Sequence, residues 1–110
     1  MTSWRTLKFQ GCDCVSRIAA VFEIGPPLPE QFPFASFTVK VLEHASGTFT
    51  ARPNVAVRKP NGYPDVYRGR GHSPDEALAD SLDYLWWSAK EYDASLSHDF
   101  IWFDKPRRRK

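Results

Sequence analysis

The chain has 110 residues, of which 42% are hydrophobic, 25% charged and 15% aromatic. This length fits one compact domain with a single core and excludes most large enzyme folds. The formal net charge of +2 conceals three blocks, because residues 1–74 carry +4, residues 75–104 carry −7 and residues 105–110 carry +5. The body up to residue 104 is therefore acidic, which favours a protein partner with a basic surface over a nucleic acid.

The cysteines and the hydrophobic pattern bear on the cellular compartment. Cys12 and Cys14 are the two cysteines of the chain, and neighbours this close would form a strained disulfide. The first residues contain no apolar segment followed by a cleavage site, and no stretch approaches about 18 consecutive apolar residues. We predict a soluble, cytoplasmic protein without a membrane segment.

The same two cysteines raise the question of a metal site. Cys12 and Cys14 could supply two thiolates to a zinc ion, with His44, His72 or His98 as distant partners. Paired zinc ligands are usually about two to four residues apart, whereas here a single residue separates them. Two ordinary reduced cysteines are the interpretation that we favour, so we predict no metal and no cofactor.

The first half of the chain contains the signals of two strands and a connector. Residues 17–24 are rich in β-branched and aromatic side chains, which favours a strand. Four prolines interrupt regular structure between Gly25 and Pro33, because proline lacks a backbone donor. From Ala35 to Glu43, apolar and polar residues alternate with the period of a half-buried strand. The apolar members of this alternation are Phe37, Val39 and Val41.

Two further strands are predicted before the helix. One runs from Thr48 to about Val57 and is interrupted by Pro53, which favours an edge position or a bulge. The segment from Lys59 to Asp65 is dense in turn-forming residues, with Asn61 and Gly62 as the expected site of positive φ. The next strand is predicted from Val66 to about Arg70. The middle of the chain is thus expected to form an antiparallel meander.

The segment Ser73-Pro-Asp-Glu76 carries the strongest local signal, that of a helix start. Ser73 is expected to cap the helix, Pro74 suits its first position, and Asp75 and Glu76 complement the positive end of the helix dipole. Glu76 also completes a capping box. We predict a helix over about residues 74–92. Its expected buried stripe is Leu78, Leu82, Leu85, Ala89 and Tyr92, flanked by Ser81 and Trp86.

The other side of this helix is acidic and aromatic. We name it the acidic helix face, and its members are Glu76, Asp80, Asp83, Tyr84, Trp87 and Glu91. After the helix, residues 99–104 are predicted to form a short strand or an aromatic segment packed on the sheet. The predicted fold class is α+β, an antiparallel sheet of three to four strands with one main amphipathic helix packed on one face. Residues 1–104 are expected to form one domain, and residues 105–110 a basic, disordered tail.

The acidic helix face suggests a function in protein binding. An exposed tryptophan among carboxylates is typical of a hot spot that binds a cationic protein surface. The alternative is that Trp87 packs beneath the aromatic segment 100–103 or beneath residues 4–9. The acidic surface would remain in either case.

Two other classes of function are compatible with the residues. A nucleic-acid-binding accessory protein would use the basic residues of the meander and of the tail, which are Arg58, Lys59, Arg68, Arg70, Arg107, Arg108, Arg109 and Lys110. The tail could equally serve only as a solubilising end. A small enzyme with an unrecognised site is the second alternative, but nothing joins the histidines to a nucleophile and a supporting acid. Non-enzymatic binding is therefore the function that we favour.

The segment from Phe37 to Leu85 resembles the HicB-like antitoxin core, a three-stranded meander followed by an amphipathic helix. Ser73-Pro-Asp-Glu-Ala77 matches the junction of that family, where Thr or Ser precedes two acidic residues and an alanine. The double-stranded RNA-binding domain has a similar joint, but its helix start carries phosphate-binding lysines where this chain has Asp75 and Glu76.

The resemblance to the HicB-like core implies a binding module of the inhibitor or antitoxin type. Such modules occur in toxin–antitoxin pairs. The block of −7 in residues 75–104 separately suits small phage-encoded blockers of bacterial defence, such as anti-CRISPR proteins, which often present acidic surfaces to nucleic-acid-binding targets. We expect a partner with a basic surface, for example a nucleic-acid-binding protein, and a homodimer is also compatible with the sequence.

Overall fold

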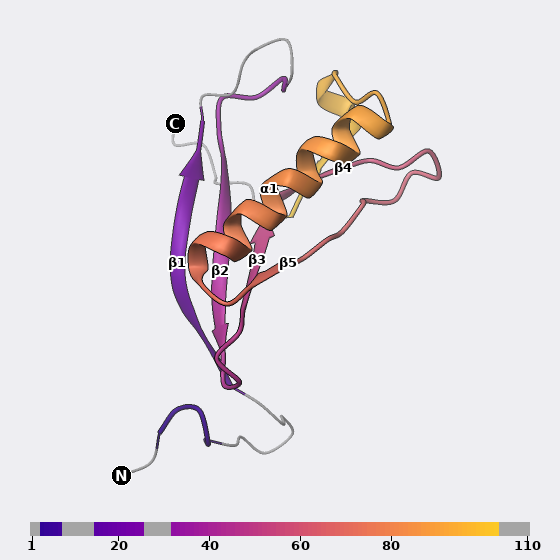
Figure 1. The fold of residues 1–110 in the computed structure, drawn as a ribbon. Helices are drawn as coiled ribbons and strands as arrows, with labels where there is room; N and C mark the ends of the chain where they lie inside the picture. Colours follow the sequence, from indigo (N-terminus) through magenta and orange to yellow (C-terminus); the bar gives the residue numbers. More distant parts are fainter. Residues whose placement is uncertain (1–2, 8–14, 26–31, 104–110) are drawn as a thin grey trace, which may run out of the picture.

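The computed structural model describes residues 3–7, 15–25 and 32–103, and it has the α+β fold class predicted from the sequence (Figure 1). The main antiparallel sheet has the strand order β1-β2-β3-β5. Its strands are β1 (Ser16–Ile24), β2 (Phe37–His44), β3 (Phe49–Pro53) and β5 (Gly69–Gly71). A second antiparallel sheet pairs β4 (Val55–Val57) with β6 (Phe100–Trp102). The helices are α1 (Pro74–Glu91) and the short 3-10 helix η1 (Ser97–Asp99).

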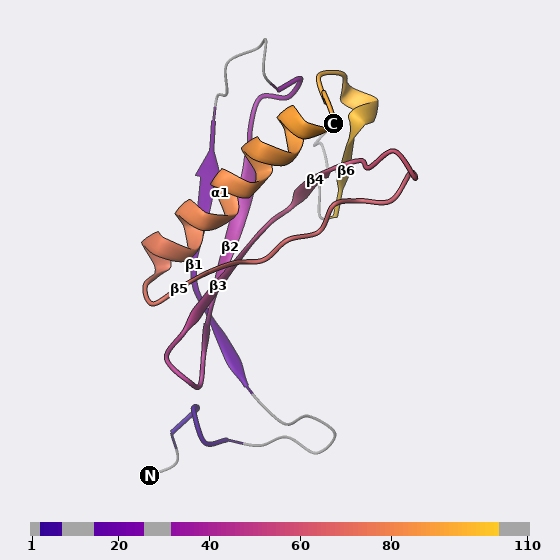
Figure 2. The same ribbon diagram turned by 45° about the vertical axis from the view of Figure 1, so that its right-hand side comes forward.

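Helix α1 crosses one face of the main sheet, and the core lies between them (Figures 1 and 2). The alternation predicted for β2 is confirmed, because Phe37, Val39 and Val41 are buried while Lys40 is exposed. Among the described residues, no helix is long and apolar enough to cross a membrane. Cys12, Cys14 and the predicted tail 105–110 lie outside the described residues.

The strand predicted from Thr48 to Val57 is divided at Asn54 into β3 and β4, which belong to different sheets. Pro53, which has no amide proton, ends β3, and Asn54 turns the chain. The amide of Thr38 donates to the side-chain oxygen of Asn54 over 3.0 Å, and the amide of Phe103 donates to its carbonyl oxygen over 2.9 Å. Asn54 therefore joins the two sheets.

The last strand of the meander is shorter than predicted and lies later in the chain. β5 comprises Gly69–Gly71, and residues 66–68 run beside α1 without pairing to the sheet. In the preceding turn, Gly62 has a φ of 90°, which confirms positive φ at that position. Asn61 is not among the residues with positive φ.

Helix α1 begins as predicted and ends one residue earlier. The Ser73 hydroxyl accepts from the amide of Glu76 over 3.1 Å, whereas the Glu76 carboxylate accepts from the amide of His72 rather than from Ser73. Tyr92 is the residue that follows the last helical position.

The buried stripe of α1 is rotated relative to the prediction. Leu85 and Ala89 are buried as expected, but Leu78, Leu82 and Tyr92 are only partly buried at the edge of the core. The residues that face the sheet are mostly small, and they are Ala77, Ser81, Leu85, Ser88 and Ala89. At Ala77 and Ser81 a small side chain is required because the glycine backbone of β5 approaches the helix closely.

The aromatic segment after the helix forms β6, as predicted, but it pairs with β4 rather than with the main sheet. Its side chains build an aromatic cluster with the segment that precedes β2. The ring centroids of Phe34 lie 5.2 Å from those of Phe100 and Trp102, and Phe32 lies 5.8 Å from Phe100. These rings cover one end of the core.

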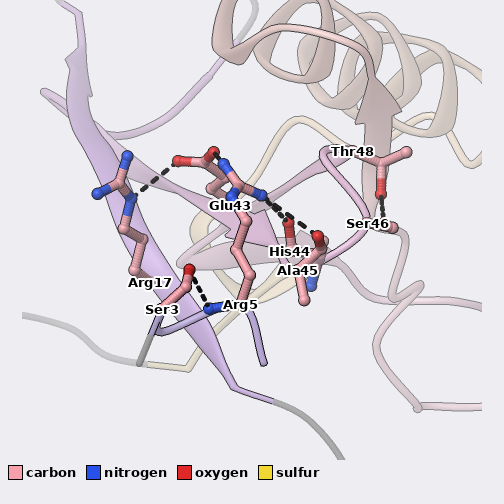
Figure 3. Close-up of polar contacts among 8 residues, drawn as sticks. All are labelled: Ser3, Arg5, Arg17, Glu43, His44, Ala45, Ser46 and Thr48. Atoms are coloured by element: carbon pink, nitrogen blue, oxygen red, sulfur yellow. Dashed lines mark hydrogen bonds and ion pairs between the residues drawn. The ribbon is translucent and has the colours of Figure 1, made fainter. Parts of the chain in front are cut away.

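An ion-pair cluster fastens the N-terminal segment to the C-terminal end of β2 (Figure 3). Glu43 is 7% exposed, and its carboxylate binds Arg17 over 2.8 Å and also binds Arg5. Arg5 donates in addition to the carbonyl oxygens of His44 and Ala45. Both guanidinium groups lie against the ring of Trp4, so the cluster is also packed by an aromatic side chain.

Replacing Glu43 with glutamine is expected to destabilise the fold at neutral pH and to leave it less sensitive to acid. The hydrogen bond from Arg17, supported by Arg5, holds the pKa of the Glu43 carboxyl below its usual value of 4.5. A lowered folded-state pKa adds stability above the unfolded pKa, and that stability is lost as the pH falls through the folded pKa. In urea unfolding, the midpoint of the wild type should therefore exceed that of Glu43→Gln at neutral pH, and the difference should disappear as the pH falls below 4.5. A difference that is constant with pH would contradict this role.

Candidate functional site

The acidic helix face is assembled by α1 itself. At about 100° per residue, its six members fall within an arc of about 100° on the helix surface. The buried residues of α1 lie on the other side, against the sheet. The face therefore points away from the sheet, but two of its members, Asp80 and Tyr84, are partly buried because the segment before β5 packs on them.

The structure adds one residue that the sequence did not indicate. Tyr67 stacks on Tyr84 with a centroid distance of 4.1 Å and an interplanar angle of 18°. Tyr84 lies 5.4 Å from Trp87 in turn. The three rings form a continuous row. Tyr84 and Trp87 belong to α1, whereas Tyr67 belongs to the chain segment before β5. Nothing in the local sequence around Tyr67 predicts this contact.

Two carboxylates hold this row of rings in place. Asp80 accepts from the hydroxyl of Tyr67 over 2.8 Å and from the amide of Arg70 over 2.9 Å. The hydroxyl of Tyr84 donates to the carboxylate of Asp65, whose two oxygens lie 2.9 and 3.0 Å from the hydroxyl oxygen. Asp80 and Tyr84 therefore also act as a scaffold for the face.

The tyrosines of the row remain neutral donors over a wide pH range. Burial raises the pKa of Tyr84 to about 12, and the hydrogen bond to Asp65 acts in the same direction. The hydrogen bond to Asp80 raises the pKa of Tyr67. Because both hydroxyls stay protonated, the hydrogen bonds that fix the rings persist at physiological pH.

The remaining members of the face are available to a partner. Trp87 is 50% exposed, and Asp83 and Glu91 are exposed. None of the ion pairs between described residues involves Asp83 or Glu91. Glu76 is exposed as well, although its carboxylate binds the amide of His72.

The two segments that were expected as possible covers of Trp87 pack elsewhere. In the N-terminal segment, Trp4 lies against Arg5 and Arg17. In the C-terminal segment, Phe100 packs against Phe32 and Phe34. The described parts of both segments thus leave Trp87 half exposed.

The structure divides the described basic residues of the alternative site into two groups, with Arg58 and Lys59 directly after β4 and Arg68 and Arg70 at β5. Arg58 donates to the carbonyl oxygens of His98 and Gly62, over 2.9 and 3.1 Å, and so holds the loop that follows β4. Arg68, in contrast, lines a hollow with residues of β2 and β3. Arg107, Arg108, Arg109 and Lys110 lie outside the described residues.

The environment of His44 bears on whether a histidine could take part in catalysis. His44 bridges Ser16 and Thr50, with 2.8 Å from each ring nitrogen to a hydroxyl oxygen. In a catalytic serine–histidine pair, the second ring nitrogen of the histidine is usually oriented by a carboxylate. In His44 that nitrogen is bound instead by the hydroxyl of Thr50. Within residues 3–7, 15–25 and 32–103, no three His, Cys, Asp or Glu side chains cluster as metal ligands.

In comparisons with known proteins, the chain matches no family model, no curated protein and no solved structure. The similarity to the HicB-like core thus stays a prediction, and the site itself is what indicates a function.

Proposed function

We propose that this chain is a non-enzymatic binding protein that docks a basic surface of a protein partner through the acidic helix face. The observation that carries the proposal is the half-exposed Trp87 beside the exposed Asp83, at the end of the ring row formed with Tyr84 and Tyr67.

The composition of the face matches that of an interaction hot spot. Tryptophan and tyrosine bury large areas at low entropy cost, and they are enriched among the residues that dominate binding energy. Arginine or lysine side chains of a partner would lie over the rings and pair with Asp83 and Glu91, which combines cation–π attraction with ion pairing. The face therefore favours a cationic partner.

The rigidity of the face supports the same proposal. The hydrogen bonds of Asp65 to Tyr84 and of Asp80 to Tyr67 fix two of the three rings before any partner arrives. Binding to a preorganised surface loses less conformational entropy than binding to a mobile one.

The type of partner suggests how binding would produce an effect. Proteins that bind nucleic acids carry basic grooves, and an acidic surface seated in such a groove would exclude the phosphates. The protein would then act as a competitive inhibitor, of the kind found among antitoxin-like proteins and blockers of bacterial defence.

The double variant Trp87→Ala/Asp83→Lys is expected to lose the partner while the fold is retained. Truncating one hot-spot residue costs about 2 kcal/mol or more, which weakens binding by about 30-fold or more. Purified wild-type and variant proteins would be immobilised, and the basic proteins that each captures from a native lysate would be quantified by mass spectrometry.

Asp93→Asn is the control, because it removes an exposed carboxylate outside both the helix face and the sheet, and asparagine tolerates the positive φ of 50° at that position. It should capture the same proteins as the wild type. Equal capture by the double variant, at an unchanged melting temperature, would refute the proposal.

A further inference from the structure

The main sheet has a second face, opposite to α1, that no described helix covers (Figures 1 and 2). The pairing register shows which residues lie there, since directly opposed residues share a face. Between β2 and β3, Lys40 lies opposite Arg52 and Leu42 lies opposite Thr50. Between β3 and β5, Thr50 lies opposite Arg70. We name this the open sheet face, and its members on β2, β3 and β5 include Lys40, Leu42, Thr50, Arg52 and Arg70.

Positive charge is concentrated on the open sheet face. Lys40 and Arg52 are exposed and stand directly opposite each other on neighbouring strands, an arrangement that is unfavourable for like charges. Arg68 joins them, because Lys40, Leu42, Thr50, Arg52 and Arg68 line one hollow.

These cations have no acidic partner among the described residues. The ion pairs there involve Arg5, Arg17 and His98 instead. Glu23 lies on the same face, because it pairs with Thr38, but it does not line the hollow and none of the ion pairs between described residues involves it. Lys40, Arg52, Arg68 and Arg70 therefore outnumber this one carboxylate. The uncompensated charge is therefore available to an external anion.

We propose that the open sheet face binds the phosphodiester backbone of a nucleic acid. Arginine presents a planar fork of donors that fits phosphate oxygens, and lysine adds a point charge. The side chains that line the hollow are cationic, aliphatic or hydroxyl-bearing, so the contacts made there go to the phosphates and carry no base sequence information.

The course of the chain favours a long polyanion over an acidic patch on a second copy of the protein. Phe103 lines a neighbouring hollow together with Val21, Lys40 and Arg52. From Phe103 the sequence continues into residues 105–110, which contain five basic residues. Lys40, Arg52, Arg68 and Arg70 present several cations on the described surface, and a nucleic-acid strand presents several phosphates in a row. This site is independent of the acidic helix face, so either proposal can fail alone.

The variant Lys40→Glu tests this site. Its binding to fluorescein-labelled oligothymidylate, oligouridylate and a DNA duplex of the same length would be measured by fluorescence anisotropy over a range of salt concentrations. These three probes distinguish single-stranded DNA, RNA and duplex DNA as sources of the phosphodiester. We expect at least about tenfold weaker binding than for the wild type and a salt slope reduced by about two, because the variant loses the Lys40 contact and its new carboxylate also neutralises Arg52.

Lys59→Glu is the matched control, because it makes the same charge change in the loop after β4. It should bind nearly as well as the wild type. The fold is controlled in the same experiment, because Lys40→Glu places a carboxylate opposite Arg52 and replaces a repulsive cross-strand pair by an attractive one. Its melting temperature should therefore not fall.

Three results would overturn the proposal. One is the absence of salt-sensitive binding by the wild type to all three probes. Another is an equal loss of binding in Lys59→Glu, which would mean that only the net charge of the chain matters. The third is a wild-type dimer that Lys40→Glu dissociates without any nucleic-acid binding, which would make the face a contact between two copies.

Discussion

Replacing Gly69 with alanine is expected to destabilise the protein by about 3 kcal/mol, since forcing extra atoms into a packed contact has a cost of this order. A Cβ atom at Gly69 would collide with the carbonyl oxygen of Ala77, and it would lie 2.5 Å from the amide nitrogen of Ser81. Both obstacles belong to the backbone of α1, so no side-chain rotation relieves them. The helix would have to move away from β5.

Urea denaturation of the Gly69→Ala variant measures this effect, and Gly62→Ala is its control. Gly62 has a φ of +90° and nothing near its missing side chain, so alanine there is strained by about 1–2 kcal/mol without any clash. A loss at Gly69 no larger than that at Gly62 would mean that α1 and β5 are not in close contact.

Replacing Phe100 with alanine is expected to destabilise the protein by about 3–5 kcal/mol, as for other large-to-small substitutions of aromatic residues in a core. Phe100 is 4% exposed, and its ring lies 5.8 Å from that of Phe32 and 5.2 Å from that of Phe34. Removing it leaves a cavity beneath β6 and removes the contact that holds the segment before β2.

Thermal and urea unfolding of Phe100→Ala would be compared with Phe103→Ala. Phe103 is 48% exposed, so its truncation should cost less than about 1 kcal/mol. The variant Phe100→Leu, which refills part of the cavity, should lie between the wild type and Phe100→Ala. Equal losses for Phe100→Ala and Phe103→Ala would contradict a packed second sheet.

The fold converts the charge blocks of the sequence into two surfaces. The acidic block contains α1, whose exposed carboxylates Asp83 and Glu91 point away from the sheet. The preceding basic block supplies Lys40, Arg52 and Arg70 to the opposite face of that sheet. The two proposed binding surfaces thus lie on opposite sides of the molecule.

Several features could be predicted from the sequence because neighbouring residues decide them. The alternation of Phe37, Val39 and Val41 defined the buried face of β2, since side chains of a strand alternate between its two faces. The hydroxyl of Ser73 caps α1 from three residues away. The same alternation put Lys40 on the exposed side of β2. The position of this lysine is the sequence signal that could have indicated the open sheet face.

Other features depend on contacts between residues far apart in the chain, and these only the folded structure could reveal. The stripe of α1 is rotated because Gly69 lets the backbone of β5 approach Ala77 and Ser81. The stack of Tyr67 on Tyr84 arises because Asp80 binds the Tyr67 hydroxyl 13 residues away.

The division of the strand at Asn54 shows the same limit. The segment 48–57 reads as one strand, but Asn54 also binds the backbone of Thr38 and of Phe103, which are distant in sequence. Hydrophobic periodicity and capping act over a few residues, whereas sheet pairing and the close approach of a helix bring distant backbones together. Periodicity and capping thus specified the elements and the outward side of α1, while long-range packing decided how the elements meet and which side chains form each surface.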